Sequence, residues 1–246
     1  MAERAADAAG AGHIDVRPAL PRGLLAAMGT RASDHAYARL LGLIVDLQLA
    51  PGSLVNEAAL AEALNLGRMP VREAVARLAA QGFLDILPRR GTIVVELSIE
   101  AARQLFEARE ALQCGLARIA ARRCRSPEPG ARPTKLSDGL RELVERAESA
   151  RDEADPEKFL LADCGVHLGL CRLAGNPWLS GPTEQLLLQN LRFWRHYFRA
   201  QPNRQASMVS HLDALAAVQA GDEDAAEGAM REHLARSRAL LDALFR

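Results

Sequence analysis

The fold of the N-terminal part of this protein is indicated by residues 67–95, which read GRMPVREAVARLAAQGFLDILPRRGTIVV. In the first half, apolar side chains recur at helical spacing and end at Gly82, a residue typical of a helix C-terminus. In the second half, two short apolar or β-branched runs, 83–87 and 92–96, flank the turn-forming residues 88–91. The stretch therefore predicts a helix followed by a β-hairpin with arginines at its tip.

Two further helices are expected immediately upstream. Apolar residues recur at helical spacing from about Asp34 to Pro51-Gly52, where the helix must stop, and a second, short helix follows Asn56. Three helices followed by a β-hairpin describe a winged helix-turn-helix, whose third helix enters the DNA major groove. We place this domain at residues 31–98 and interpret residues 1–30, which lack a sustained period, as a flexible tail.

The third predicted helix has two chemically different faces. Its apolar side chains fall on one side, while two arginines four residues apart point outward from its first turns. Arginine donates in the forked geometry that guanine edges and phosphates accept, so this face suits a recognition helix. The alternative interpretation is an ordinary solvated arginine face. Together with the hairpin tip, the candidate DNA-contacting residues are Arg68, Met69, Arg72, Arg89, Arg90 and Gly91.

The charge balance limits how the protein can bind DNA. Among 246 residues, 31 Lys and Arg equal 31 Asp and Glu, so the formal net charge is zero. Overall positive charge therefore cannot attract nucleic acid, and DNA contact must come from a local basic patch. Aromatic residues make up only 4% of the chain, which favours packed helices over sheets.

From residue 99 to the C-terminus the pattern is purely helical. The spacing and the intervening Pro, Gly and Asp residues predict helices at about 99–123, 136–152, 156–174, 178–200, 204–220 and 222–245. We therefore expect a mostly α protein with an N-terminal winged helix-turn-helix and, at 99–246, a C-terminal all-α bundle of about six to seven helices. No stretch is apolar enough for a membrane span and no signal peptide is evident, so we expect a cytoplasmic protein without membrane contact.

Four polar residues of this helical region could converge. Asp163 and His167 are i and i+4 on one predicted helix and so share a face, and His211 and His233 lie near the middle of two later helices. An unpaired charge among apolar residues is costly, whereas one carboxylate and three neutral imidazoles around a divalent cation satisfy one another. The alternative is that these histidines lie on the surface or each make a single hydrogen bond.

The N-terminal motifs resemble the DNA-binding domain of GntR-family bacterial transcription regulators. The residues that carry this resemblance are Pro51-Gly52, Leu60-Ala61, the run 67–74, Leu78, Gly82 and Arg90-Gly91. The resemblance implies that Arg68, Arg72 and the wing around Arg90-Gly91 contact operator DNA. Gly67 and Met69 stand where hydroxyl residues are usual in the family, which removes side-chain contacts to DNA and leaves the operator sequence open.

Residues 99–246 are similar to the FCD effector-binding domain of the FadR subfamily. The matching marks are the run 106–110, Asp163 with His167, the run 174–177, His211, the run 220–222, and Met230-Arg231 with His233-Leu234. The resemblance implies a divalent metal ion, such as Zn, Ni or Mn, held by Asp163, His167, His211 and His233. It also implies that Arg109 holds the carboxylate of a small organic acid, with Asn176 and Arg195 as weaker candidates for effector contact.

Each effector candidate also has a simpler interpretation. Arg109 could pair with Glu107 on the surface, Asn176 could only cap a helix end, and Arg195 could belong to a solvated run of arginines.

The leading hypothesis is a homodimeric, ligand-responsive DNA-binding transcription regulator that is not an enzyme. It would bind double-stranded operator DNA and a small carboxylate metabolite, and the metabolite would change the separation of the two recognition helices. The alternatives are a helical metalloenzyme with an appended DNA-binding domain and a metal sensor in which the ion is the signal. No obvious general base or nucleophile stands beside the metal ligands, although Glu107 or Glu110 could serve.

Overall fold

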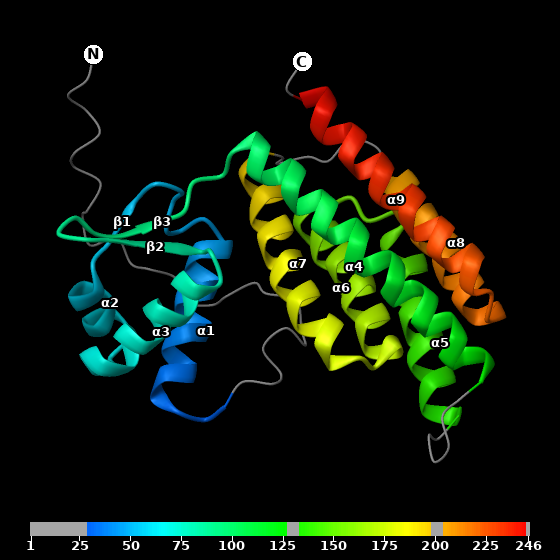
Figure 1. Cartoon of the computed structure of the whole chain (residues 1–246), viewed down its shortest axis with the longest axis horizontal. Coiled ribbons are helices and arrows are strands. Elements are labelled where there is room, and N and C mark those ends of the chain that lie inside the picture. Colours follow the sequence, from blue (N-terminus) through cyan, green and yellow to red (C-terminus); the bar gives the residue numbers. More distant parts are fainter. Residues whose placement is uncertain (1–28, 127–132, 198–203, 245–246) are drawn as a thin grey trace. The chain divides into compact units, whose positions relative to one another are not determined.

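The computed structural model of the chain describes residues 29–126, 133–197 and 204–244. It contains two compact units, and the division falls between Val95 and Glu96. Figure 1 shows helices with a small sheet in the first unit and helices alone in the second. The tail expected at 1–30 lies outside the described residues except for its last two positions.

The first unit is built on three helices, α1 (Ala32–Val45), α2 (Glu57–Ala63) and α3 (Arg68–Ala80). Asn56 caps α2, because its side-chain oxygen accepts hydrogen bonds from the first backbone N–H groups of that helix. The helices α1 and α3 pack against each other. The buried side chains of α3 are those that its periodicity predicts, namely Val71, Ala74, Val75 and Leu78.

A small antiparallel sheet completes this unit. Its strands are β1 (Leu54–Val55), β2 (Leu84–Leu87) and β3 (Gly91–Val94), in the order β1-β3-β2. The β2–β3 hairpin lies within a residue or two of the sequence prediction, and its tip turns through positive φ angles at Arg89 and Gly91. The sequence did not predict β1, because a two-residue strand is too short to show a period.

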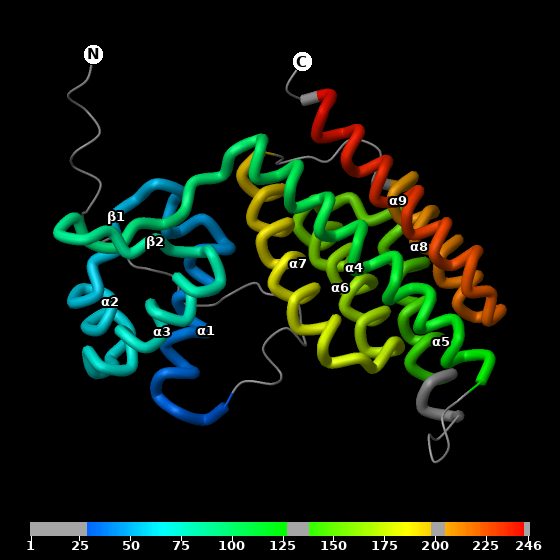
Figure 2. The backbone as a smooth tube through the Cα atoms, in the orientation of Figure 1, coloured from blue at the N-terminus to red at the C-terminus, as the bar shows by residue number. Residues whose placement is uncertain are grey.

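The second unit consists, over the described residues, of six helices. They are α4 (Ile99–Arg125), α5 (Pro133–Ala150), α6 (Pro156–Ala174), α7 (Pro177–Tyr197), α8 (Arg204–Ala220) and α9 (Glu223–Leu244). The longest, α4, contacts α6, α7, α8 and α9, so it forms the spine of the bundle, as the tube in Figure 2 lets the reader follow. Side-chain caps set several helix starts: Ser98 accepts from the backbone of α4, Asp155 from that of α6 and Asp222 from that of α9.

The core of the second unit is apolar along most of its length, with side chains such as Phe159, Met208, Leu215 and Met230 fully buried. Buried polar side chains interrupt this core on five helices, α4, α6, α7, α8 and α9, which is unusual enough to require an explanation. Among the described helices, none combines the length and apolar composition needed to cross a bilayer. The predicted fold class, a winged helix-turn-helix followed by an all-α bundle, is confirmed.

Candidate metal centre and nucleic-acid interface

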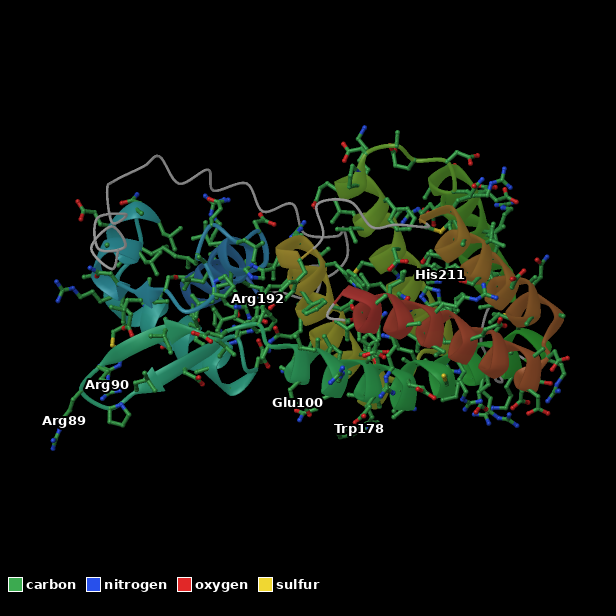
Figure 3. The ribbon with its side chains drawn as sticks, turned by 90° about the horizontal axis from the view of Figure 1, so that it is seen from above. Arg89, Arg90, Glu100, Trp178, Arg192 and His211 are labelled. Atoms are coloured by element: carbon green, nitrogen blue, oxygen red, sulfur yellow. The ribbon has the colours of Figure 1, made fainter. Side chains whose placement is uncertain are left out.

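Four polar side chains converge inside the bundle from three helices. Asp163 and His167 come from α6, His211 from α8 and His233 from α9. Each offers one ligand atom, and these four atoms all lie within 4.8 Å of one another. The carboxylate is 9% exposed and the three histidines 2% or less, so the alternative of surface histidines is wrong. Figure 3 labels His211 among the helices of this unit.

The pairs within this cluster are in close contact. Nε2 of His211 lies 2.9 Å from Oδ1 of Asp163, and the centre of its ring lies 3.9 Å from that of His233 and 4.7 Å from that of His167. Three imidazoles this close in a buried site cannot all carry a proton charge.

Burial sets the protonation of the cluster. It lowers the pKa of His167 and of His233 well below the ordinary value, and the neighbouring His211 lowers both further. Burial alone would raise the pKa of Asp163, but the contact with His211 outweighs it, and the carboxyl pKa falls well below its usual range. The cluster is therefore an ionised carboxylate with at least two neutral imidazoles, which is the protonation that metal coordination requires.

The hydroxyl of Ser210 fixes the tautomer of His233. Ser210 donates its single hydroxyl proton to the backbone carbonyl of Ser207 at 2.7 Å, and its oxygen lies 3.0 Å from Nδ1 of His233. Since that proton is already donated, the oxygen accepts, and Nδ1 of His233 must carry the hydrogen. The lone pair is then on Nε2, the atom left for coordination.

Arg109 contacts the cluster from α4. Its side chain is 1% exposed, so the alternative of a surface pair with Glu107 is wrong. One guanidinium nitrogen donates to Oδ1 of Asn190 at 2.7 Å, and the other lies 3.2 Å from Nε2 of His167. Burial lowers the pKa of Arg109 to about 10, against the opposing effect of Asp163, so the side chain remains a cation at neutral pH.

These residues fit a divalent metal ion. Bonds of about 2.0–2.2 Å to nitrogen and oxygen place ligand atoms up to about 4.4 Å apart, so an ion would need only small adjustments here. The buried Nδ1 atoms of His167 and His211 have no hydrogen-bond partner among the described residues, which is costly for a purely structural cluster. One carboxylate and three imidazoles suit Zn, Ni or Mn and do not choose among them.

Sequence reasoning did not find the polar residues around the cluster. Ser207 donates to Asp163 at 3.2 Å, and Ser210 orients His233. Gln113, one turn beyond Arg109 on α4, is 3% exposed, and its amide has no partner in the described part of the chain. The only sequence signal was position: Ser207 and Ser210 lie on the same helix as His211, within one turn of it.

The two weaker effector candidates have other contacts. Asn176 accepts from the backbone of Trp178, which is the helix-capping role considered as its simpler alternative. Arg195 pairs with Glu157 of α6, and its side chain is only 8% exposed, so it is not part of a solvated run.

The exposed face of α3 carries the candidate DNA-reading residues. Arg68, Met69 and Arg72 are all exposed, and Met69 is 65% exposed although it is apolar. The third arginine of α3, Arg77, instead pairs with Asp34 at 2.8 Å and does not belong to this free face. At the hairpin tip, Arg89 and Arg90 are exposed, and Figure 3 shows Arg89 extending away from the ribbon.

Comparisons with known proteins match two parts of the chain to family models. Residues 32–94 match the model for bacterial regulatory proteins of the gntR family, and residues 104–236 match the FCD domain. The transcriptional repressor RspR of Escherichia coli is 30% identical over 204 residues, which cover 82% of this chain and 85% of that protein. The regulator LutR of Bacillus subtilis is 29% identical over 82% of this chain and 98% of its own length. The solved structure of E. coli McbR/YncC superposes with a TM-score of 0.72 at 22% identity, covering 89% of this chain and all of that one.

Proposed function

Because the chain belongs to the GntR family of DNA-binding transcription regulators and carries an FCD domain, we propose that it is a metal-dependent regulator whose DNA affinity responds to a small organic acid. The family and the relatives are regulators rather than enzymes. The boundaries that we propose for the two functional parts are 31–98 for DNA binding and 99–246 for metal and effector binding.

The observation that carries this proposal is the buried cluster of Asp163, His167, His211 and His233. Four ligands leave one or two positions on a metal that accepts five or six, and a carboxylate oxygen can fill them. The ion would supply a Lewis acid at the centre of the bundle. Around it, this chain supplies the ligands and a buried cation, Arg109, which we propose pairs with the carboxylate of the effector.

A single copy of the chain would bind DNA only weakly through α3. A single neutral domain offers few cationic contacts to phosphate, and pairing doubles them. We therefore propose a homodimer on a two-fold-related operator. In it, Arg68 and Arg72 would read or position the major groove, with Met69 beside them, and Arg89, Arg90 and Gly91 of the wing would contact the backbone.

Helix α4 is the proposed link between the effector and DNA. It begins at Ile99, five residues after the end of β3, and it carries Arg109 to the cluster. The hydroxyl of Tyr197 on α7 donates to the backbone carbonyl of Leu97 at 2.7 Å, which ties the segment before α4 to the bundle. A shift of α4 on effector binding would therefore be passed to the segment that leads to the wing.

The test is metal content together with DNA binding. We expect about one divalent ion per chain in the purified protein, and His211→Ala should lose it while keeping its helical content. Full metal retention in His211→Ala would remove this residue from the site and weaken the proposal. Glu142→Ala on the exposed face of α5 is the control, since its carboxylate pairs with the exposed Arg146 at 2.5 Å.

Measurements of operator affinity then distinguish a regulator that responds to an organic acid from one that responds to the metal ion alone. For a metal-dependent effector site, operator affinity changes when an organic acid is added to the metal-loaded protein. If instead the metal alone changes the affinity and no organic acid adds to it, the protein is a metal sensor. Operator affinity that responds to neither would contradict the proposal.

A further inference from the structure

The exposed face of α3 carries a large apolar side chain among its charged residues. Met69, in the first turn of the helix, is 65% exposed. A single exposed apolar residue is common on protein surfaces and by itself indicates nothing. What distinguishes Met69 is its position on the helix and the chemistry of its neighbours.

Met69 lies opposite the buried side of α3. The exposed residues of the helix extend from Arg68 on one side to Arg77 on the other, and successive residues turn by about 100°. They therefore cover about half of the circumference, and Met69 falls near the middle of that arc. The buried residues Val71, Ala74, Val75 and Leu78 occupy the other half. Met69 thus points directly away from the core of its own unit, near the N-terminal end, which is where a recognition helix contacts base edges.

The charges beside Met69 indicate what it can face. Arg68 and Arg72 lie together on one side of it, and a guanidinium binds either phosphate or the edge of a guanine. Glu73, exposed one turn beyond Met69, shares its line on the helix. On the other side, Arg77 pairs with Asp34 at 2.8 Å. A thioether and a carboxylate offer phosphate nothing, so the line of Met69 and Glu73 suits the base edges rather than the DNA backbone.

Base edges in the major groove present one apolar group, the 5-methyl group of thymine. A methionine side chain is unbranched and has three rotatable bonds, so it can adjust to such a group. Contact would remove apolar surface of both partners from water, and no other base would replace that gain.

We propose that Met69 is a specificity-determining residue that packs against the 5-methyl group of a thymine in the major groove. The contact selects thymine at one position of each half of a two-fold-related operator. This inference rests on the proposed function, since it requires α3 to enter the major groove.

The test removes the methyl group from the DNA. Full-length wild-type protein first selects its preferred duplex from a random-sequence pool. Each thymine of that duplex is then replaced by deoxyuridine, which forms the same base pair and lacks only the methyl group. Fluorescence anisotropy measures the affinity. At one position we expect a loss of about fourfold for one half-site and about 10- to 15-fold for both, the effect of burying one methyl group in each.

Variants of Met69 show whether this residue makes the contact. Met69→Gln keeps the length and the helix propensity of the side chain but removes its apolar end. It should bind the thymine and deoxyuridine duplexes with affinities within about 1.5-fold of each other. Met69→Ala should do the same, and it covers the case that the glutamine forms a new hydrogen bond to a base. Trp178→Gln on α7 is the matched control, because it also replaces an exposed apolar residue, and it should keep the wild-type preference. Melting temperature and helical content are measured on every variant.

The outcomes separate this inference from the function on which it rests. If the wild type selects no sequence, base reading by α3 and the methyl contact fall together. If it selects a sequence but no deoxyuridine replacement weakens binding by twofold, the methyl contact is overturned while operator binding stands. If the wild type and both Met69 variants lose the same factor on deoxyuridine, another residue reads the methyl group and the assignment to Met69 is wrong.

Discussion

Replacing Ser210 by alanine should weaken metal binding although Ser210 does not touch the metal site directly. In the structure the hydroxyl accepts from Nδ1 of His233, which places the coordinating lone pair on Nε2. Without it, the buried N–H has no partner and the imidazole is free to change tautomer or rotate. Loss of such an orienting partner typically lowers metal affinity by about 10- to 100-fold.

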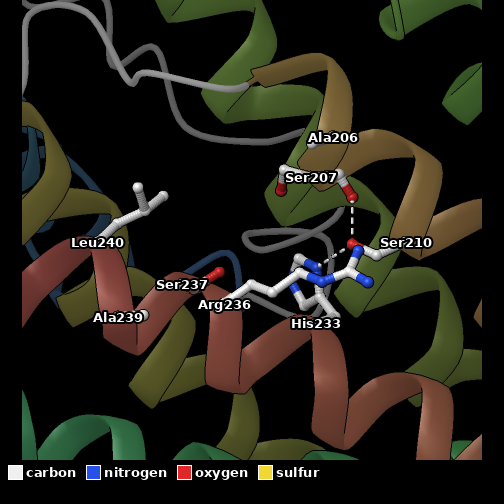
Figure 4. Close-up of a pocket in the computed structure, with 8 residues that line it drawn as sticks. All are labelled: Ala206, Ser207, Ser210, His233, Arg236, Ser237, Ala239 and Leu240. Carbon is white, nitrogen blue, oxygen red and sulfur yellow. Dashed lines mark hydrogen bonds between the residues drawn. The ribbon is translucent and has the colours of Figure 1, made fainter.

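That range corresponds to about 1.4–2.8 kcal/mol of binding free energy, since each tenfold change is about 1.4 kcal/mol. It agrees with the cost of about 1–3 kcal/mol for leaving a buried donor unsatisfied. Ser210 is 4% exposed, but it lines a cavity with room for water (Figure 4), so a water molecule can partly replace the lost oxygen. The lower part of the range is therefore expected.

The assay is competition between the protein and a zinc chelator of known affinity, at neutral pH. Ser149→Ala is the control, because Ser149 also bonds a backbone carbonyl on its own helix, at 2.8 Å, but is exposed on α5. Ser210→Thr keeps the hydroxyl and should restore most of the affinity, because Ser210 lines a cavity that has room for a methyl group. Equal zinc affinity in the wild type and Ser210→Ala would refute the assigned tautomer.

Three other predictions test separate parts of the molecule. Arg72→Ala should weaken operator binding by about 1–3 kcal/mol if this arginine reads a base, as measured by fluorescence anisotropy; an equal loss on random DNA would make it a phosphate contact. Arg109→Met, which keeps most of the buried volume, should abolish the response of DNA binding to the effector while metal stays bound; the coupling lost is about 1–3 kcal/mol, and a normal response would exclude the carboxylate contact. Gly175→Ala should destabilise the protein by about 1–2 kcal/mol in urea unfolding, because Gly175 has a φ of 55°, a left-handed conformation that strains a residue with a Cβ. Gly165→Ala on the same helix, with nothing within 4 Å, should instead stabilise it by about 0.5–1 kcal/mol, and equal effects of the two changes would contradict the backbone argument.

Different residues of the candidate metal site supply the ligand atoms and orient them. Asp163 and the three histidines supply the ligand atoms, while Ser207 and Ser210 on α8 orient two of them. Arg109 reaches the same cluster from α4, the helix that follows the wing in sequence. A molecule bound at the cluster would therefore contact or displace side chains from four helices, α4, α6, α8 and α9.

Local periodicity was enough to predict the fold. The apolar face of α3, the glycine that follows it and the hairpin tip depend on neighbours within a few residues, so residues 67–95 indicate them directly. The strand β1 escaped prediction because only its partner in β3, far along the chain, defines it. The cluster residues could be named from the i, i+4 pair on α6 and from the family resemblance.

The order and type of the elements therefore follow from the sequence alone, as do the kinds of side chain available to a metal and to DNA. Which of those side chains contact one another depends on how the helices pack. In the folded chain, Arg109 is buried beside His167, Asn176 caps the start of α7, and Arg195 pairs with Glu157. The same packing brings Ser210 to His233 and opens a cavity beside them. The physical reason is that helical spacing fixes faces within one helix, whereas the angle and depth at which two helices pack depend on all the side chains between them.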